Sequence, residues 1–392
     1  MAVKLNEIYK SNKKEMKLIA GKNGLNEIVR WVHMAEGINI SVFRDEQELT
    51  FTTGIVLREK NELFELVKLC QKNKSSGMVI NTGPFIKEIS QEIIEFCDNN
   101  NFPLFEVTWD IYVAEIMKKI CYQITLSERT NLELSAAIKN AIFLPEQKEM
   151  YVLQLERYSF RPEWPYRVII IDIIRKDGIP LDDKRKDYTL KKIENFITYK
   201  YKNTVSLELN NKVILLLSNY GEQKIDLILK ELKENLEKLT TENEFFFISI
   251  GNNVNSIYEI HKSYNQALNT IKIQIKKNDQ NSIYKYQDLG IYKLLLSIEN
   301  QSLIKEYYQE VLGEIEKNDK LNGTDYLEVL KCYLKYNGSV KAVAEELFYH
   351  KNTVGYKLQK IEQFLGDNLS YQSVRLNCNI ALMLKEIFET SI

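Results

Sequence analysis

The most informative part of the sequence runs from Tyr326 to Leu365, where the residue spacing predicts three short helices joined by tight turns. Asn337-Gly338 ends the first helix, because glycine readily adopts the left-handed backbone of a helix end. Ser339 can cap the second helix, and Phe348-Tyr349 forms the second turn. The apolar residues recur every three or four positions; they are Leu327, Leu330 and Leu334, then Val340, Val343, Ala344 and Leu347, then Val354, Leu358, Ile361 and Leu365. This pattern predicts a helix-turn-helix.

The third helix begins near His350 and has a polar face opposite Val354. At about 100° per residue, Asn352, Tyr356 and Gln359 lie on that face. The flanking positions are Lys351, Thr353, Gly355, Lys357 and Lys360. Asparagine and glutamine can bond to adenine edges, and lysine and threonine suit phosphates or guanine. The face therefore predicts contact with DNA, although an ordinary amphipathic helix with a solvated polar face fits the periodicity as well.

The N-terminal part alternates strand and helix patterns. Strands are expected at residues 29–34, 49–53, 77–81 and 103–107, with helices at 59–72 and around 89–97. Such alternation predicts a parallel sheet with right-handed crossovers, and ligands bind such sheets beyond the carboxyl ends of the strands. A ligand pocket is therefore predicted beside Thr52, Thr53, Gly54, Asn81 and Thr82. The alternative is that Gly54 and Gly83 only make turns.

A helical segment from about residue 110 to 158, broken near Pro145, follows the first domain. One of its faces carries an apolar stripe, Ile116, Ile120, Cys121 and Ile124. The stripe can pack within the chain or against a second copy. We favour the dimer interpretation, because the other apolar stripe of this kind, in the final helix, must also support the DNA-binding bundle. That second stripe is Leu376, Ile380, Leu384 and Ile387.

The middle part mixes strands and helices. Strands are expected at residues 167–174, 206–209, 212–218 and 245–251, and helices near 188–201, 225–239 and 257–271. Asn210-Asn211 joins two of these strands into a hairpin, and from Asp288 onward only helices are expected. The predicted chain is therefore an α/β sensor with a parallel sheet (1–125), a helical linker (126–160), an α+β domain (161–287) and an all-α helix-turn-helix domain (288–392).

The third helix and its surroundings closely resemble the C-terminal helix-turn-helix of the PucR/CdaR family, the regulators of purine catabolism and of sugar diacids. Residues 347–358, which read Leu-Phe-Tyr-His-Lys-Asn-Thr-Val-Gly-Tyr-Lys-Leu, carry the family pattern, as do Ile361-Glu362 and residues 365–369. The resemblance implies that the DNA-binding residues are His350, Lys351, Asn352, Thr353, Tyr356, Lys357, Gln359 and Lys360. Two positions depart from the pattern: Lys357 replaces the usual arginine, and Gly355, where a basic residue is common, costs about 1 kcal/mol of helix stability relative to alanine.

The rest of the chain is similar to the same family. Residues 18–29, 48–54 and 102–107 look like the PucR N-terminal domain, which implies a sensor of a small metabolite. Residues 250–267 and 286–292 look like a middle domain related to the GGDEF nucleotide cyclase fold. Asp172 falls where that fold holds a metal-binding aspartate, but the hairpin at residues 208–212, Glu-Leu-Asn-Asn-Lys, has no Gly-Gly and no acidic pair to seat phosphates and metal. We therefore expect no catalysis, and we expect Asp172 to be a solvated strand end.

Composition excludes several classes of protein. The formal net charge is −1, so any positive DNA-binding surface must be local. Five scattered cysteines and three histidines predict neither a metal cluster nor disulfides, and we expect buried, reduced thiols and no cofactor; the cysteines are Cys70, Cys97, Cys121, Cys332 and Cys378. No segment has the roughly 18 apolar residues of a membrane span, and the start has no signal-peptide core. We expect a cytoplasmic protein without a membrane partner.

The expected function is that of a DNA-binding transcription regulator, with activation favoured over repression, that controls a catabolic pathway as a homodimer or higher homo-oligomer. Its effector is expected to be a purine-breakdown product, another nitrogen-rich intermediate, an amino acid or a sugar acid. Two alternatives remain. A nucleotide-binding cyclase-like enzyme predicts turnover, and a scaffold predicts no salt-sensitive affinity for DNA.

Overall fold

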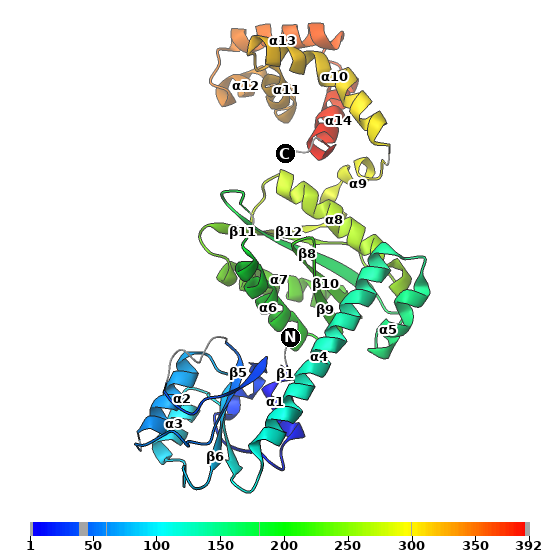
Figure 1. Cartoon of the computed structure of the whole chain (residues 1–392). Coiled ribbons are helices and arrows are strands. Elements are labelled where there is room, and N and C mark those ends of the chain that lie inside the picture. The colour runs from blue at the N-terminus through cyan, green and yellow to red at the C-terminus, as the bar shows by residue number, and fades with distance from the viewer. Residues whose placement is uncertain (1–2, 39–45, 60, 180, 299, 389–392) are drawn as a thin grey trace. The chain divides into compact units, whose positions relative to one another are not determined.

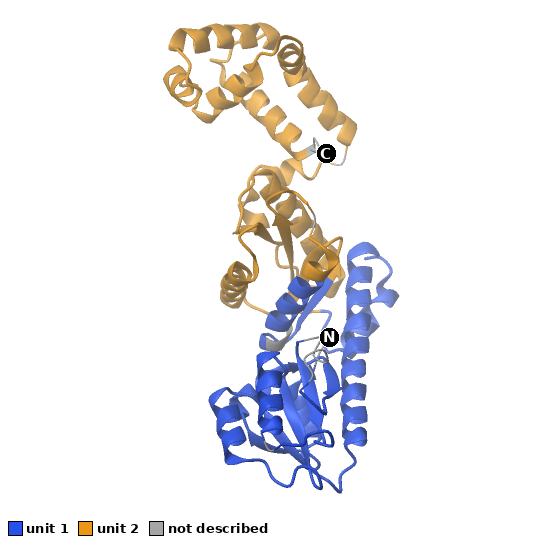
Figure 2. Ribbon diagram, turned by 60° about the vertical axis from the view of Figure 1, so that its left-hand side comes forward, with its two compact units in different colours: residues 1–162, 187–207 blue, residues 163–186, 208–392 orange. Residues whose placement is uncertain are grey.

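The structure is a computed structural model of the chain and describes residues 3–38, 46–59, 61–179, 181–298 and 300–388 (Figure 1). The chain forms two compact units (Figure 2). The first contains residues 1–162 and 187–207, and the second contains residues 163–186 and 208–392.

A five-stranded sheet with the order β2-β7-β6-β5-β4 is the centre of the first unit. Its strands are β2 (Lys17–Ala20), β4 (Trp31–Met34), β5 (Glu48–Thr52), β6 (Gly77–Thr82) and β7 (Leu104–Thr108). The neighbouring pairs β4/β5, β5/β6 and β6/β7 are parallel, which confirms the predicted parallel sheet. The edge strand β2 is antiparallel to β7 and was not predicted, because only Ala20 of its four residues is buried and the segment shows no strand-like alternation.

The strand predicted at residues 29–34 is wrong as a single element. β3 (Ile28–Val29) pairs with β1 (Val3–Lys4) in a separate two-stranded sheet, whereas β4 begins at Trp31 and pairs with β5. The chain therefore changes its pairing partner at Arg30. A run of apolar residues cannot show such a change, because both strands bury the same kinds of side chain.

Helices cover both faces of the first sheet. They are α1 (Leu5–Ser11) and α4 (Val113–Phe143) on one face and α2 (Glu62–Lys72) and α3 (Gln91–Asn99) on the other. The 3-10 turn η1 (Lys22–Asn26) follows β2, and η3 (Lys148–Met150) and α5 (Val152–Arg157) follow α4. In β6, Val79 packs in a core with α1 and α4, while Met78 and Ile80 pack in a second core with α2 and α3. Because successive strand residues point to opposite faces, every residue of β6 is buried.

The apolar stripe of α4 packs inside the first unit. The side chains of Ile116, Ile120 and Ile124 are at most 1% exposed, and they lie in the same core as Phe51 and Phe105 of the sheet. The dimer interpretation of this stripe is therefore wrong. The spacing predicts a buried face correctly but cannot say whether a sheet of the same chain or a second copy covers it. The predicted break near Pro145 is confirmed, since α4 ends at Phe143 and α5 begins at Val152.

The second sheet has the order β12-β11-β8-β10-β9. Its strands are β8 (Tyr166–Arg175), β9 (Thr204–Leu209), β10 (Lys212–Ser218), β11 (Glu244–Ile250) and β12 (Ser282–Lys285), and the accompanying helices are α6 (Asp183–Lys200), α7 (Glu222–Leu239), η4 (Ile257–Glu259) and α8 (Ile260–Lys276). β8 is antiparallel to both β10 and β11. Positive φ angles of 51° at Asn210 and 62° at Asn211 form the predicted hairpin turn. β12 was not predicted, since all its residues are half-buried and give no alternation.

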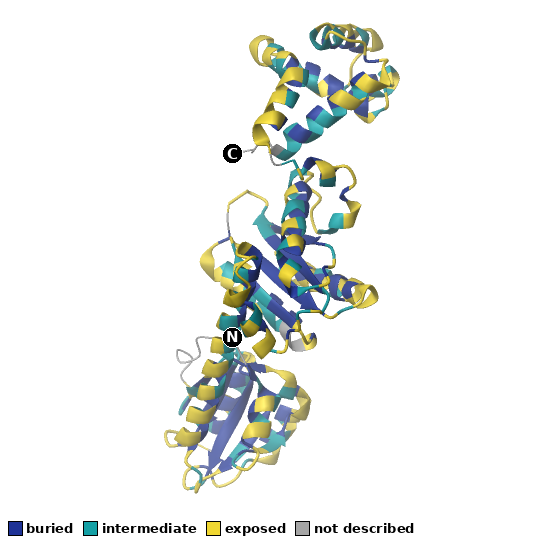
Figure 3. Ribbon diagram, turned by 90° about the vertical axis from the view of Figure 1, so that its right-hand side faces the viewer, coloured by how far each residue is buried: buried dark blue, intermediate teal, exposed yellow. Residues whose placement is uncertain are grey.

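The C-terminal part is helical throughout the described residues after β12. Its elements are η5 (Tyr286–Leu289), α9 (Tyr292–Leu295), α10 (Gln301–Asn322), α11 (Tyr326–Lys335), α12 (Val340–Glu346), α13 (Lys351–Leu365) and α14 (Gln372–Phe388). Residues that pack into a common core are buried, and the ribbon of the helical part is coloured accordingly, dark blue where it is buried and yellow where it is exposed (Figure 3). The inward face of α14 carries Val374, Cys378, Ala381 and Leu384. Leu376, expected in its apolar stripe, is instead 57% exposed.

Candidate nucleic-acid interface

The helix-turn-helix is built as the sequence predicts. Gly338 has φ of 87°, and its N–H donates to the carbonyl of Tyr333 at 2.8 Å, which closes the end of α11. The Ser339 hydroxyl accepts from the backbone N–H of Ala342 and caps α12. His350 caps α13, since its Nδ1 accepts from the backbone N–H of Asn352 at 3.3 Å. These local hydrogen bonds set where each helix begins and ends.

The outer face of α13 is open to solvent. Val354 and Ile361 are fully buried on the inner face, whereas Asn352, Tyr356 and Gln359 are exposed. The other residues predicted to contact DNA are divided by exposure: His350, Lys351 and Thr353 are exposed, while Lys357 and Lys360 are half-buried. The geometry thus brings an exposed polar face and the start of α13 onto one surface, which is what a groove-binding helix requires.

Lys357 has surroundings that the sequence did not indicate. Its ammonium group forms an ion pair with Asp325, just before α11, and lies 4.0 Å from the ring centroid of Tyr349. The Tyr349 hydroxyl donates to the same carboxylate at 2.7 Å. Burial acts to raise the pKa of Asp325, but the hydrogen bonds from Lys357 and Tyr349 outweigh it and hold that pKa below its usual value. Because the Asp325 carboxylate largely neutralises its charge, the ammonium group of Lys357 would attract a phosphate only weakly.

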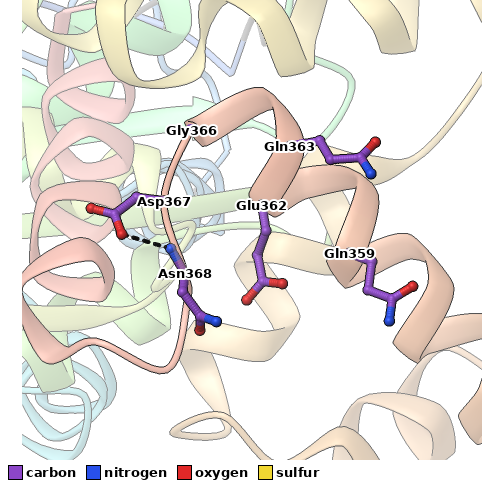
Figure 4. Close-up of a pocket in the computed structure, with 6 residues that line it drawn as sticks. All are labelled: Gln359, Glu362, Gln363, Gly366, Asp367 and Asn368. Atoms are coloured by element: carbon purple, nitrogen blue, oxygen red, sulfur yellow. Dashed lines mark hydrogen bonds between the residues drawn. The ribbon is translucent and has the colours of Figure 1, made fainter.

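The two ends of α13 differ in charge. Its first turn has no acidic residue and begins with Lys351. Near its C-terminal end lies an open hollow lined by Gln359, Glu362, Gln363, Gly366, Asp367 and Asn368 (Figure 4). There the carboxylate of Glu362 accepts from the N–H of Leu369 at 2.9 Å, and that of Asp367 accepts from the N–H of Asn368 at 2.8 Å. Acidic groups repel phosphates, so the phosphates of DNA are not expected beside Glu362 and Asp367.

The predicted ligand residues of the first unit do come together at one edge of the sheet, because β5 and β6 are parallel neighbours. Their polar groups, however, bond within the chain. The Thr53 hydroxyl donates to the carboxylate of Glu36 at 2.9 Å, and the Asn81 amide donates to the carbonyls of Val107 and Thr108 at 3.1 and 3.2 Å.

Two further residues at this edge have local roles. The Thr82 hydroxyl donates to Glu106 at 3.2 Å. Gly54 has φ of 72°, and an added Cβ would lie 2.5 Å from the side chain of Ile86. The backbone conformation and the nearby Ile86 therefore explain glycine at position 54, in line with the alternative that Gly54 only makes a turn.

Sequence reasoning missed a group of exposed apolar residues at the same edge. They follow the carboxyl ends of β5, β6 and β7, and they are Ile55, Val56, Phe85, Trp109 and Tyr112. The rings of Phe85 and Trp109 meet edge to face with centroids 5.7 Å apart. The sequence could have indicated this group, because each of these apolar residues lies within a few positions of the end of a predicted strand. An apolar surface with a few polar groups suits a small organic ligand.

The middle domain contradicts one expectation about Asp172. Its side chain is not a solvated strand end but lies within β8, 7% exposed, and pairs with Lys212 of β10. A buried carboxylate needs such a partner, and Lys212 supplies it. Among the residues that the structure describes, no three His, Cys, Asp or Glu side chains gather as a metal site requires.

The cysteines are mostly buried, as predicted. Cys70, Cys97, Cys332 and Cys378 are buried, and Cys121 is half-buried; all five are free thiols. Burial raises the pKa of both Cys70 and Cys97 to about 12, which keeps them as unreactive thiols at neutral pH. The described residues include no helix with the length and apolarity of a membrane span.

Comparisons with known proteins match three parts of the chain. Residues 7–124 match the Purine catabolism regulatory protein-like family, residues 146–273 the GGDEF-like domain, and residues 326–384 the PucR C-terminal helix-turn-helix domain. The GGDEF-like match describes a fold and does not by itself imply catalysis.

The chain is similar to three curated regulatory proteins. The proline-responsive transcriptional activator PutR of Bacillus subtilis (strain 168) is 28% identical over 276 residues, which cover 68% of this chain and 65% of the relative. The carbohydrate diacid regulator of Escherichia coli (strain K12) is 24% identical over 62% of this chain and 66% of its own. The purine catabolism regulatory protein of Bacillus subtilis (strain 168) is 34% identical over 31% of this chain and 23% of its own. The chain thus spans less than two thirds of the length of each relative.

Proposed function

We propose that this chain, which belongs to the PucR/CdaR family of transcription regulators, regulates transcription by binding DNA through α13 and responds to a small molecule bound by its first unit. The observation that carries the proposal is the arrangement of α13, which buries Val354 and Ile361 while it exposes Asn352 and Tyr356. Asparagine and glutamine on such a free face can bond to base edges in the major groove.

We assign direct base contacts to Asn352, Tyr356 and Gln359, and phosphate contacts to Lys351, Thr353 and Lys360. His350 supports the site by capping α13 and is itself exposed. Lys357 is left out because its ammonium group is paired with Asp325. Gel-shift titration of a duplex that the purified protein selects from a random-sequence library tests the assignment, and equal affinity for a scrambled duplex would contradict it.

The effector site that we propose is the apolar edge of the first sheet, at Phe85 and Trp109 beside Thr53. The names of the relatives mention proline, carbohydrate diacids and purine catabolism, so the pathway is not the same throughout the family. A thermal-shift screen of purine catabolites, amino acids and sugar acids can identify the effector, because a ligand that binds only the folded state raises its melting temperature. A purine catabolite is the first compound class to test. The pathway encoded by the genes that flank this one should guide the choice of a second.

We further propose that the protein acts as an activator and as a homodimer on paired half-sites, because one helix-turn-helix contacts only a few base pairs. The stripe at Ile116, Ile120 and Ile124 cannot supply the interface, since it is buried within the first unit. Light scattering of the purified chain gives its mass directly. A monomer that binds its selected duplex at a one-to-one ratio would overturn the dimer.

A further inference from the structure

Phe348, in the turn between α12 and α13, combines two unfavourable features. Its backbone has φ of 56°, in the left-handed region, and its side chain is 95% exposed. Among the described residues other than glycine, most that have a positive φ are asparagines, and Phe348 is the one aromatic residue. The left-handed region is sterically unfavourable for a residue with a Cβ, and exposure of the ring gives up the free energy that burying it would provide.

The backbone geometry of the turn favours glycine at position 348. The N–H of Tyr349 donates to the carbonyl of Ala344 at 2.9 Å, which is the hydrogen bond of a Schellman helix end, with Phe348 at the left-handed position. In the same bundle, α10 and α13 end with glycine at the equivalent point, Gly323 with φ of 63° and Gly366 with φ of 67°. Neither backbone preference nor packing therefore explains a phenylalanine at this place.

We propose that the ring of Phe348 is a DNA-contacting group that packs against a deoxyribose, and a thymine methyl where one is present, at the edge of the groove that α13 enters. The proposal rests on the proposed function. Phe348 lies two residues before the cap of α13, beside the exposed His350 and Lys351, and the first turn of α13 has no acidic residue. An apolar ring next to a cationic side chain complements the sugar and the phosphate of one nucleotide, and aliphatic or aromatic contact with thymine methyls is a known form of base reading.

The test compares variants of Phe348 in the full-length protein. Phe348→Gly and Phe348→Asn relieve the backbone, because both residues tolerate the left-handed region, and both remove the ring. We expect each to raise or maintain the melting temperature and to weaken binding of the library-selected duplex by roughly 10-fold or more, the loss that removal of one well-packed apolar side chain produces. Phe348→Tyr keeps the ring and is expected to keep the affinity. A loss of affinity without a loss of melting temperature could not come from a purely structural role of Phe348.

Three results would overturn the proposal. If Phe348→Gly lowers both melting temperature and affinity, the residue is structural. If its affinity equals that of wild type while Asn352→Ala loses binding, DNA recognition by α13 stands and Phe348 takes no part in it. If Phe348→Gly binds DNA normally but fails to regulate a reporter gene, the ring contacts a protein partner instead. A wild-type protein that selects no duplex at all would overturn the proposed function itself, and this proposal with it.

Discussion

The ammonium group of Lys357 and the carboxylate of Asp325, 32 residues apart in the sequence, form an ion pair that joins the middle of α13 to the residue before α11. Tyr349 completes the cluster, since its hydroxyl bonds to the same carboxylate and its ring lies beside the lysine. The cluster therefore ties the helix that we assign to DNA to the helix behind it. We infer that the cluster contributes to orientation and stability, whereas the family resemblance implied that Lys357 contacts DNA.

Lys357→Met, which keeps the apolar stem and removes the charge, is expected to lower the stability of the C-terminal bundle by about 1–2 kcal/mol at neutral pH. The pKa of Asp325 is lowered in the folded state, so its contribution is complete above the unfolded value of about 3.9 and is lost as the pH falls through the folded value. For Lys357, burial acts to lower the pKa, but the bonds to Asp325 and Tyr349 outweigh it and raise the pKa. Its contribution is complete below about pH 10.4 and is lost as the pH rises through the folded value.

Thermal melts of wild type and Lys357→Met between pH 3 and pH 11 measure this difference. It should be constant between about pH 5 and pH 9 and shrink at both extremes. A difference that stays the same over the whole range, at both extremes, would contradict a contribution from the ion pair.

Asn352→Ala should weaken binding to the selected duplex by about 1–3 kcal/mol and relax sequence preference at one position. Lys351→Ala should instead weaken binding to all sequences and reduce the slope of log affinity against log salt by about one. The same holds for Lys360→Ala, less strongly, because its amino group already bonds to Gln363 at 3.1 Å.

Lys357→Met is the matched control for Lys351→Ala, since it removes a lysine of the same helix whose charge is already paired. We expect it to leave the salt slope unchanged. Equal slopes for all the lysine variants and wild type would mean that neither Lys351 nor Lys360 lies against a phosphate.

Thr53→Trp is expected to abolish the ligand-induced rise in melting temperature while binding of the selected duplex persists. The larger side chain removes the hydroxyl that bonds to Glu36 and fills the edge of the sheet near Ile55 and Val56. Thr53→Val, which removes only the hydroxyl, separates loss of the hydrogen bond from steric filling. A ligand shift that survives Thr53→Trp would place the effector elsewhere.

Ile120→Ala should cost about 2–5 kcal/mol of stability in the first unit, the usual range for a fully buried isoleucine, without a change in oligomeric mass. Tyr122, two residues along the same helix, is 68% exposed, and Tyr122→Ala should change stability by no more than about 0.5 kcal/mol. Denaturant unfolding and light scattering of both variants test this. If Ile120→Ala dissociated a dimer while it stayed as stable as wild type, the burial of the stripe within the unit would be contradicted.

The elements that could be predicted from the sequence are those with strong local signals. The strands that end at Thr52 and Thr82 are buried along their whole length. The helix-turn-helix has regular apolar spacing and two recognisable caps. β2 and β12 could not be predicted, because short edge strands are only partly buried and their side chains show no period. The exposed group at Phe85 and Trp109 was missed because exposed apolar residues are common and acquire meaning only when the sheet gathers them.

The sequence by itself determined the helix-turn-helix, the left-handed turn at Gly338 and the cap at Ser339, since each depends on interactions between residues a few positions apart. It also indicated the parallel sheet, because strand and helix patterns alternate along the chain. The tertiary structure alone decided that Ile120 packs against its own sheet, that Asp172 is buried beside Lys212, and that the charge of Lys357 is taken up by Asp325. An apolar stripe or a charged side chain in the sequence shows only that it needs a packing surface or an oppositely charged group. Which partner meets it depends on packing between segments that are distant in the chain, and no local periodicity encodes that choice.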